Sequence, residues 1–117
     1  MAWLGSTGVS IRVEPAAVGA LVEGTWAYVM TAGPDGAHVV ALRPEVRAGG
    51  RLRVEVGTGR AGRNIDGGSL VTLVFPPCDG WPHVGYSLVV DARPLPTDIT
   101  GVVDLECLGA VWHRPAP

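Results

Sequence analysis

The stretch GRLRVEVGTGRAGRNI, residues 50–65, runs from a regular β-strand into a glycine-rich bend. In its first half, Leu52, Val54 and Val56 alternate with charged residues, which predicts a strand with one buried face. Its second half has glycines at 57, 59 and 62, and these allow tight turning and close approach of the backbone to a ligand. We therefore expect a β-rich fold in which this strand ends at a bend that a ligand can reach.

The bend concentrates hydrogen-bond donors in residues 58–64. Thr58, Arg60, Arg63 and Asn64 supply a hydroxyl, two guanidinium groups and an amide. Guanidinium groups suit bidentate contact with phosphate oxygens, so the pattern indicates an anion site, in particular one for a cofactor phosphate. The alternative is a polar turn whose arginines are simply solvated. No Gly-Lys-Ser/Thr follows at the spacing of a nucleotide-binding P-loop.

Most of the remaining chain has the pattern of short strands separated by turns. A helix is expected at 15–23, a hairpin of strands 26–32 and 37–43 around the turn Gly33-Pro34-Asp35-Gly36, and a helical turn at 61–66. Further strands are expected at 51–56, 69–75, 84–91 and 99–113, with a connector at 93–98 and a bulge at Gly109. This pattern predicts a single domain, residues 1–117. We expect a mainly β fold: a six-stranded antiparallel barrel with a short N-terminal helix and a short helix after the third strand.

The composition limits the range of partners. Hydrophobic residues make up 47% of the 117 residues and charged residues only 17%, so part of the apolar surface is expected to be buried against another subunit. The net charge of -2 gives no electrostatic reason to expect nucleic acid or an anionic membrane as partner. No apolar run reaches bilayer length and the start does not resemble a signal peptide, so a cytoplasmic location is expected.

The cysteines and histidines give no sign of a disulfide or a metal site. Cys78 and Cys107 are expected as free thiols, and the histidines at 38, 83 and 113 lack the spacing of metal ligands. Trp81 and His83, in a proline-rich loop, either line a substrate cleft or pack at a subunit interface, and the interface is the preferred interpretation. Residues 112–114 either reach toward a partner's cofactor or simply end the last strand, and the latter is preferred.

The order of these segments resembles that of a known family. The hairpin, GRLRVEVGTGRAGRNI, SLVTLVFPP, GYSLVVDA and a closing strand ending HRPAP are similar to the pyridoxamine 5'-phosphate oxidase-like split-barrel flavoproteins, especially small actinobacterial members. The resemblance covers roughly residues 15–117. It implies a homodimer that holds FMN in clefts between its subunits, with a small molecule as substrate. The chain looks too short for a true pyridoxamine 5'-phosphate oxidase, so the vitamin substrate is not carried over.

The resemblance also implies where the flavin lies. The family's phosphate site, at the end of the third strand, falls on Thr58, Arg60, Arg63 and Asn64. The flavin ring falls on the strand after the first hairpin turn, here Val40, Ala41 and Leu42 with their neighbours Val39 and Arg43. Side chains on that strand have core packing as their alternative role, although its backbone groups can still bond to the ring.

Two classes of function remain open at this point. The first is a flavin-dependent oxidoreductase that transfers hydride between FMN and a small organic substrate, with a deazaflavin as alternative cofactor; no side-chain catalyst is evident. The second is a non-catalytic protein that binds or stores flavin, deazaflavin or haem. A vestigial domain that dimerises without a ligand is a third, weaker possibility.

Overall fold

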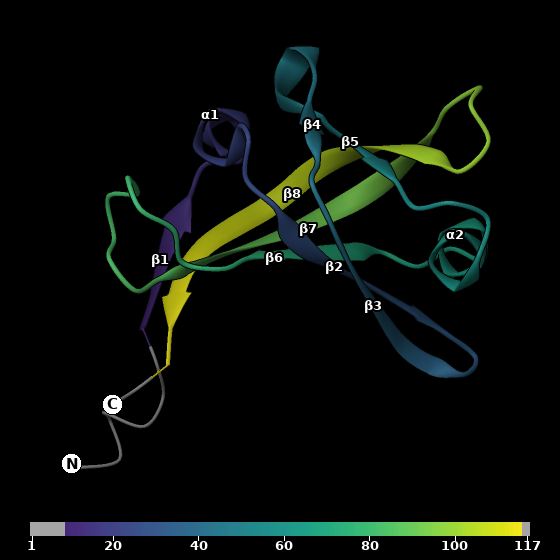
Figure 1. The fold of residues 1–117 in the computed structure, drawn as a ribbon, viewed down its shortest axis with the longest axis horizontal. Coiled ribbons are helices and arrows are strands. Elements are labelled where there is room, and N and C mark those ends of the chain that lie inside the picture. Colours follow the sequence, from purple (N-terminus) through teal and green to yellow (C-terminus); the bar gives the residue numbers. More distant parts are fainter. Residues whose placement is uncertain (1–8, 116–117) are drawn as a thin grey trace.

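The computed structural model of this chain describes residues 9–115, which form one curled antiparallel sheet and two short α-helices (Figure 1). The strands are β1 (Val9–Val13), β2 (Ala27–Gly33), β3 (Gly36–Leu42), β4 (Glu45–Val46), β5 (Leu52–Glu55), β6 (Val71–Phe75), β7 (Ser87–Pro96) and β8 (Val102–Arg114). The helices are α1 (Val18–Val22) and α2 (Arg60–Asp66). The strand order is β3-β2-β6-β7-β8-β5-β4, with β1 also paired to β8, and the sheet curls into a half-barrel.

Strand β8 connects the two halves of the sheet. One of its edges pairs with β7 along most of its length, while the other pairs with β1 near the C-terminal end and with β5 near the N-terminal end. On the β5 side, the Arg53 guanidinium donates two hydrogen bonds to the Asp104 carboxylate, at 2.7 and 3.2 Å. The long strand β8 therefore holds β1, from the start of the chain, in the same sheet as β5 and β7.

The hydrophobic core lies on the concave face of the sheet. Alternate residues of each long strand are buried there, as in β6, where Val71, Leu73 and Phe75 are fully covered and the residues between them are not. Val18 and Val22 of α1 also join this core, as does Ile65 of α2. The two helices lie at opposite ends of the curled sheet, so each covers one end of the core (Figure 1).

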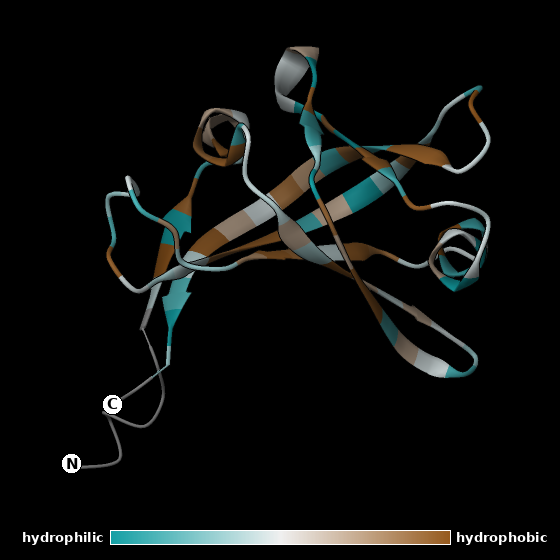
Figure 2. Cartoon of the chain, in the orientation of Figure 1, coloured by the Kyte–Doolittle hydropathy of each residue, from teal (hydrophilic) through white to brown (hydrophobic). Residues whose placement is uncertain are grey.

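The opposite face of the sheet is also rich in apolar residues. The strand register places Tyr28, Met30, Val39, Val74, Val89 and Val111 on this outer face. Tyr28 is 43% exposed and Val39 is 50% exposed, and Trp26 packs edge-on against the Tyr28 ring. Apolar residues recur along β6 and β8 in Figure 2, whereas the turn between β2 and β3 is paler or hydrophilic.

The mainly β prediction is confirmed, but the expected count of six strands is wrong. The described chain has eight, because β1 and the two-residue β4 were not expected. The N-terminal helix is confirmed as a 3-10 turn at Pro15–Ala17 that continues into α1, and α2 begins one residue before the expected helical turn. Both short helices therefore lie where the sequence predicted them.

The connector predicted at 93–98 is wrong, because β7 continues as a strand to Pro96. Beyond Ala92 this strand pairs with β8 alone, since its pairing with β6 ends there. An edge of this kind tolerates prolines at alternate positions when their missing N–H groups would face the unpaired side. The predicted bulge at Gly109 is confirmed to within one residue: the register shifts between Asp91 and Ala92, leaving Leu108 as the extra residue of β8.

The loop after β6 packs against its own chain. The Trp81 ring lies edge-on to Trp112 with ring centroids 5.0 Å apart, and its indole N–H donates to the Leu21 carbonyl at 3.0 Å. His83 lies beside Trp112 and Tyr86. Trp112 is buried near the end of β8, as the simpler interpretation of the tail predicted, whereas the partner contact expected of Trp81 and His83 stays a prediction. No helix among residues 9–115 is long and apolar enough to cross a bilayer.

Candidate functional site

The glycine-rich bend after β5 is held in a single tight arrangement. Gly57 has a φ of 73°, a left-handed conformation that favours glycine, and its N–H donates to the Gly101 carbonyl at 3.0 Å. Gly62, the third residue of α2, packs closely against the backbone of Gly57. A Cβ added at Gly62 would lie 2.3 Å from the Gly57 carbonyl oxygen. The bend and the helix are therefore fixed to each other by backbone contact. Gly68, with a φ of 99°, follows the end of the helix.

Three of the four predicted phosphate ligands are at least partly accessible to solvent. Thr58 and Arg63 are exposed, and Arg60 is partly buried. Arg60 and Arg63 are three residues apart on α2, a spacing that brings helical side chains to neighbouring positions. A phosphate site requires that these two guanidinium groups and the Thr58 hydroxyl reach one ligand, and this assignment stays a prediction.

Arg60 already makes one contact within the chain. Its guanidinium donates a hydrogen bond to the backbone carbonyl of Asp35 at 2.8 Å, and Asp35 lies in the turn between β2 and β3. The bond joins the start of α2 to the tip of this hairpin. Sequence reasoning did not identify Asp35, because a backbone carbonyl leaves no signal in the residue type.

Asn64, the fourth predicted ligand, points into the protein. It is 8% exposed, and its side-chain amide donates to the Thr31 hydroxyl at 3.0 Å. Gly33 lies against the same side chain, since a Cβ at that position would lie 2.1 Å from Asn64 Oδ1. Asn64 thus holds α2 on strand β2, and its contact with a cofactor stays a prediction without support from this geometry.

The residues predicted to face a flavin ring lie on an edge strand. Val40 and Leu42 pack against the core, whereas Ala41 is exposed on the outer face opposite Tyr28. Among the described strands, β3 pairs only with β2. Half of its backbone N–H and C=O groups therefore face away from the sheet and are free to bond to a ligand.

The fold brings these two segments together. Helix α2 contacts both β2 and β3, although at least 17 residues separate α2 from β3 in sequence. Side-chain hydrogen bonds from α2 reach the tip of this hairpin, where Arg60 bonds to Asp35 and Asn64 to Thr31, and Val40, Ala41 and Leu42 follow along β3 toward its other end (Figure 1). The exposed aromatic pair Trp26 and Tyr28 lies on the outer face of this hairpin, and sequence reasoning did not identify it as part of a site.

Comparison with known proteins gives a likeness of fold. No protein-family model matches the chain. No curated protein matches it either. The crystal structure of an FAD-binding protein from Mesorhizobium loti aligns with a TM-score of 0.58 at 15% sequence identity, over 92% of this chain and 98% of that chain. At this identity the likeness concerns the fold, and it extends over nearly the whole of both chains.

Proposed function

We propose that this protein binds a flavin, as the pyridoxamine 5'-phosphate oxidase-like split-barrel proteins do, and that the cofactor is FMN. The observation that carries the proposal is the contact of the arginine-bearing bend with the β2–β3 hairpin, whose tip it joins through the hydrogen bond from Arg60 to Asp35. The whole-chain likeness of fold to an FAD-binding protein supports it. The bend offers two guanidinium groups three residues apart, whereas the ring segment has only Arg43 at its end, so we assign the phosphate to the bend and the ring to β3.

Each part of the proposed site has a distinct role. Arg63 and Thr58 are exposed donors for the phosphate, and Arg60 adds a second guanidinium whose position its bond to Asp35 fixes. Backbone groups of Val40, Ala41 and Leu42 would bond to the ring edge, and Tyr28 beside Ala41 supplies an apolar surface. When bound, a flavin supplies hydride transfer, and the protein contributes binding and orientation. A deazaflavin has the same ring shape and remains the alternative cofactor.

We further propose that the protein works as a homodimer whose subunits meet across the outer face of the sheet. Large apolar side chains are exposed on that face, with Trp26, Tyr28 and Val39 each at least 42% exposed. A second copy that covered this face would also enclose a ring lying along β3.

Replacement of Arg63 by alanine tests the phosphate assignment. We expect R63A to weaken FMN binding roughly tenfold to a hundredfold, the value of a hydrogen bond to a charged group. Riboflavin, which lacks the phosphate, should bind R63A as it binds the parent protein. R60A should weaken both ligands, because it also releases the hairpin from α2. Isothermal titration with both ligands measures these differences.

The matched control is R51A, which removes an exposed arginine from the same stretch but outside the bend. It should leave both affinities unchanged. If R63A binds FMN as tightly as the parent, Arg63 is solvated and the phosphate assignment is wrong. Reduction of the bound flavin by a nicotinamide, followed by turnover of a second acceptor, would distinguish an oxidoreductase from a flavin carrier.

A further inference from the structure

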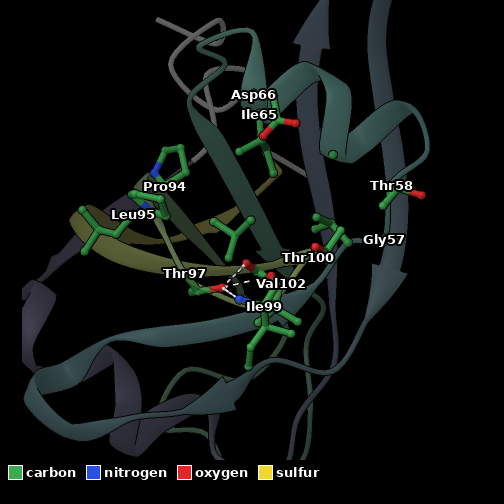
Figure 3. A pocket seen from close by; sticks show the side chains of 15 residues that line it. Gly57, Thr58, Ile65, Asp66, Pro94, Leu95, Thr97, Ile99, Thr100 and Val102 are labelled. Carbon is green, nitrogen blue, oxygen red and sulfur yellow. Dashed lines mark hydrogen bonds between the residues drawn. The ribbon is translucent and has the colours of Figure 1, made fainter.

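A cavity of about 440 Å³ lies on the other side of α2, between this helix and the turn that joins β7 to β8 (Figure 3). One wall comes from the end of β5 and from α2, including Ile65 and Asp66. The other comes from residues 94–97 and 99–103. Its volume falls within the range of sites that bind small molecules. Arg60, Arg63 and the edge of β3 take no part in its lining, whereas Thr58 does.

The walls of this cavity are held in place by the fold. The Thr97 hydroxyl donates to the Val102 carbonyl at 2.7 Å and accepts the Ile99 N–H at 3.1 Å, which closes the β7–β8 turn on itself. The Gly101 carbonyl accepts the N–H groups of Val56 and Gly57, so this turn is also fixed to the end of β5. A cavity already ordered in the folded chain loses little conformational entropy when a ligand enters.

The lining is mostly apolar and carries a charge of one sign. Valine, isoleucine, leucine and proline side chains form most of it, and Asp66 is the one ionisable side chain among its lining residues. Asp66 is exposed at the rim on the α2 side, beside Ile65 (Figure 3). Arg60, by contrast, is directed to the β2–β3 turn. Helix α2 therefore separates a side rich in arginine from a cavity whose only charge is negative.

We propose that this cavity binds a small, largely apolar molecule that carries an amine. The apolar part lies among the side chains of β7, β8 and Ile65, and the ammonium group donates to the Asp66 carboxylate. A carboxylate or phosphate on the same framework is repelled by Asp66. The proposal does not depend on flavin binding, because Thr58 is the only side chain assigned to the flavin that also lines this cavity, and the amine is assigned to Asp66.

Three indole compounds with different charges test this assignment: tryptamine, 3-methylindole and indole-3-acetate. Titrations followed by two-dimensional ¹H–¹⁵N NMR should shift the amides of residues 56–66 and 94–103. Tryptamine should bind about three- to fivefold more tightly than 3-methylindole, the value of an ion pair at an exposed rim. Indole-3-acetate should bind most weakly of the three.

Two variants locate the binding. D66N should bring tryptamine to the affinity of 3-methylindole, while its control D79N, at an exposed loop carboxylate, should change nothing. I99W places a bulky ring at the mouth of the cavity and should block all three compounds, while V84W, at another exposed apolar loop residue, should not. Equal affinity for the three compounds, or shifts confined to other residues, would each overturn the proposal.

Discussion

Gly57 is the residue at which three segments of the chain meet. An added Cβ at Gly62 would lie 2.3 Å from its carbonyl oxygen, and one at Gly101 would lie 3.1 Å from its Cα atom. Gly57 and Gly62, which the sequence analysis assigned to close approach of a ligand, therefore also allow two segments of backbone to pack closely. This packing sets the orientation of α2, and with it the side of the helix from which Arg63 projects.

For the substitution G62A, helix propensity and packing predict changes in stability of opposite sign. In an ordinary helix interior, glycine to alanine stabilises by about 1 kcal/mol. Here G62A would press a methyl group into the Gly57 carbonyl, so we expect it to destabilise the fold by about 1–3 kcal/mol. Chemical denaturation measures the difference, and G109A is the control, because an added Cβ at that position meets open space. A G62A protein as stable as the parent would contradict the close contact.

The neighbouring residues Arg63 and Asn64 show the limit of sequence reasoning at this scale. Both are polar and both belong to one glycine-rich bend, so the sequence predicted the same role for both. In the fold, Arg63 is exposed and Asn64 is buried against Thr31. The difference arises from how α2 packs on β2, more than 25 residues away in sequence, and no local pattern carries that information.

At the scale of elements, apolar patterns predicted the strands well and proline misled the prediction. Strand β5 matches the range expected from its alternation, and β6 matches the range expected from its nearly continuous apolar run, although β6 buries only every second residue. The second half of β7 was predicted as a connector because of Pro94 and Pro96, which are disfavoured in a central strand. They are accommodated because β6 is too short to pair with that half. The permitted position of a proline depends on the neighbouring strand, which local sequence does not reveal.

The pairing of β5 with β8 should make stability depend on pH. The hydrogen bonds from Arg53 hold the pKa of Asp104 below its ordinary value of 3.8. Because the folded state favours the charged carboxylate, this stabilisation is complete above the ordinary carboxyl pKa and is lost as the pH falls through the lower, folded value. We expect D104N to be less stable than the parent at pH 7, and the difference in the free energy of unfolding to shrink below about pH 4.

Urea denaturation at a series of pH values from 7 down to 2.5 measures this difference. The control is E23Q, which alters an exposed carboxylate at the end of α1, whereas the carboxylate that pairs with Arg53 is Asp104. Its difference from the parent should not follow the curve of D104N. A D104N protein whose loss of stability is the same at every pH would show that the ion pair does not couple folding to protonation.

At the scale of the whole molecule, the sheet has two apolar faces and only one of them is covered. The concave face contains the core, while the outer face leaves Tyr28 and Val39 substantially exposed. The high apolar fraction of the sequence led us to expect a partner. The apolar fraction alone does not show where the interface lies. The outer face is assembled from β2, β3, β6, β7 and β8, and the order of these strands depends on long-range pairing.

The substitution Tyr28→Arg tests whether a second copy covers this face. Tyr28 lies on β2 with its ring against Trp26, and it is already 43% exposed, so an arginine there should leave the monomer folded. In an interface of the size of obligate dimers, ~2,000 Å² in total, the same arginine would be buried without a partner. We expect the parent to sediment as a dimer at micromolar concentration and Y28R to dissociate at least roughly 100-fold more readily.

The control V84R adds the same charge at a loop residue that is 92% exposed, and it should remain dimeric. Circular dichroism establishes that both variants are folded. A parent protein that sediments only as a monomer would remove the dimer, and a Y28R protein that dimerises as the parent does would place the interface elsewhere on the molecule.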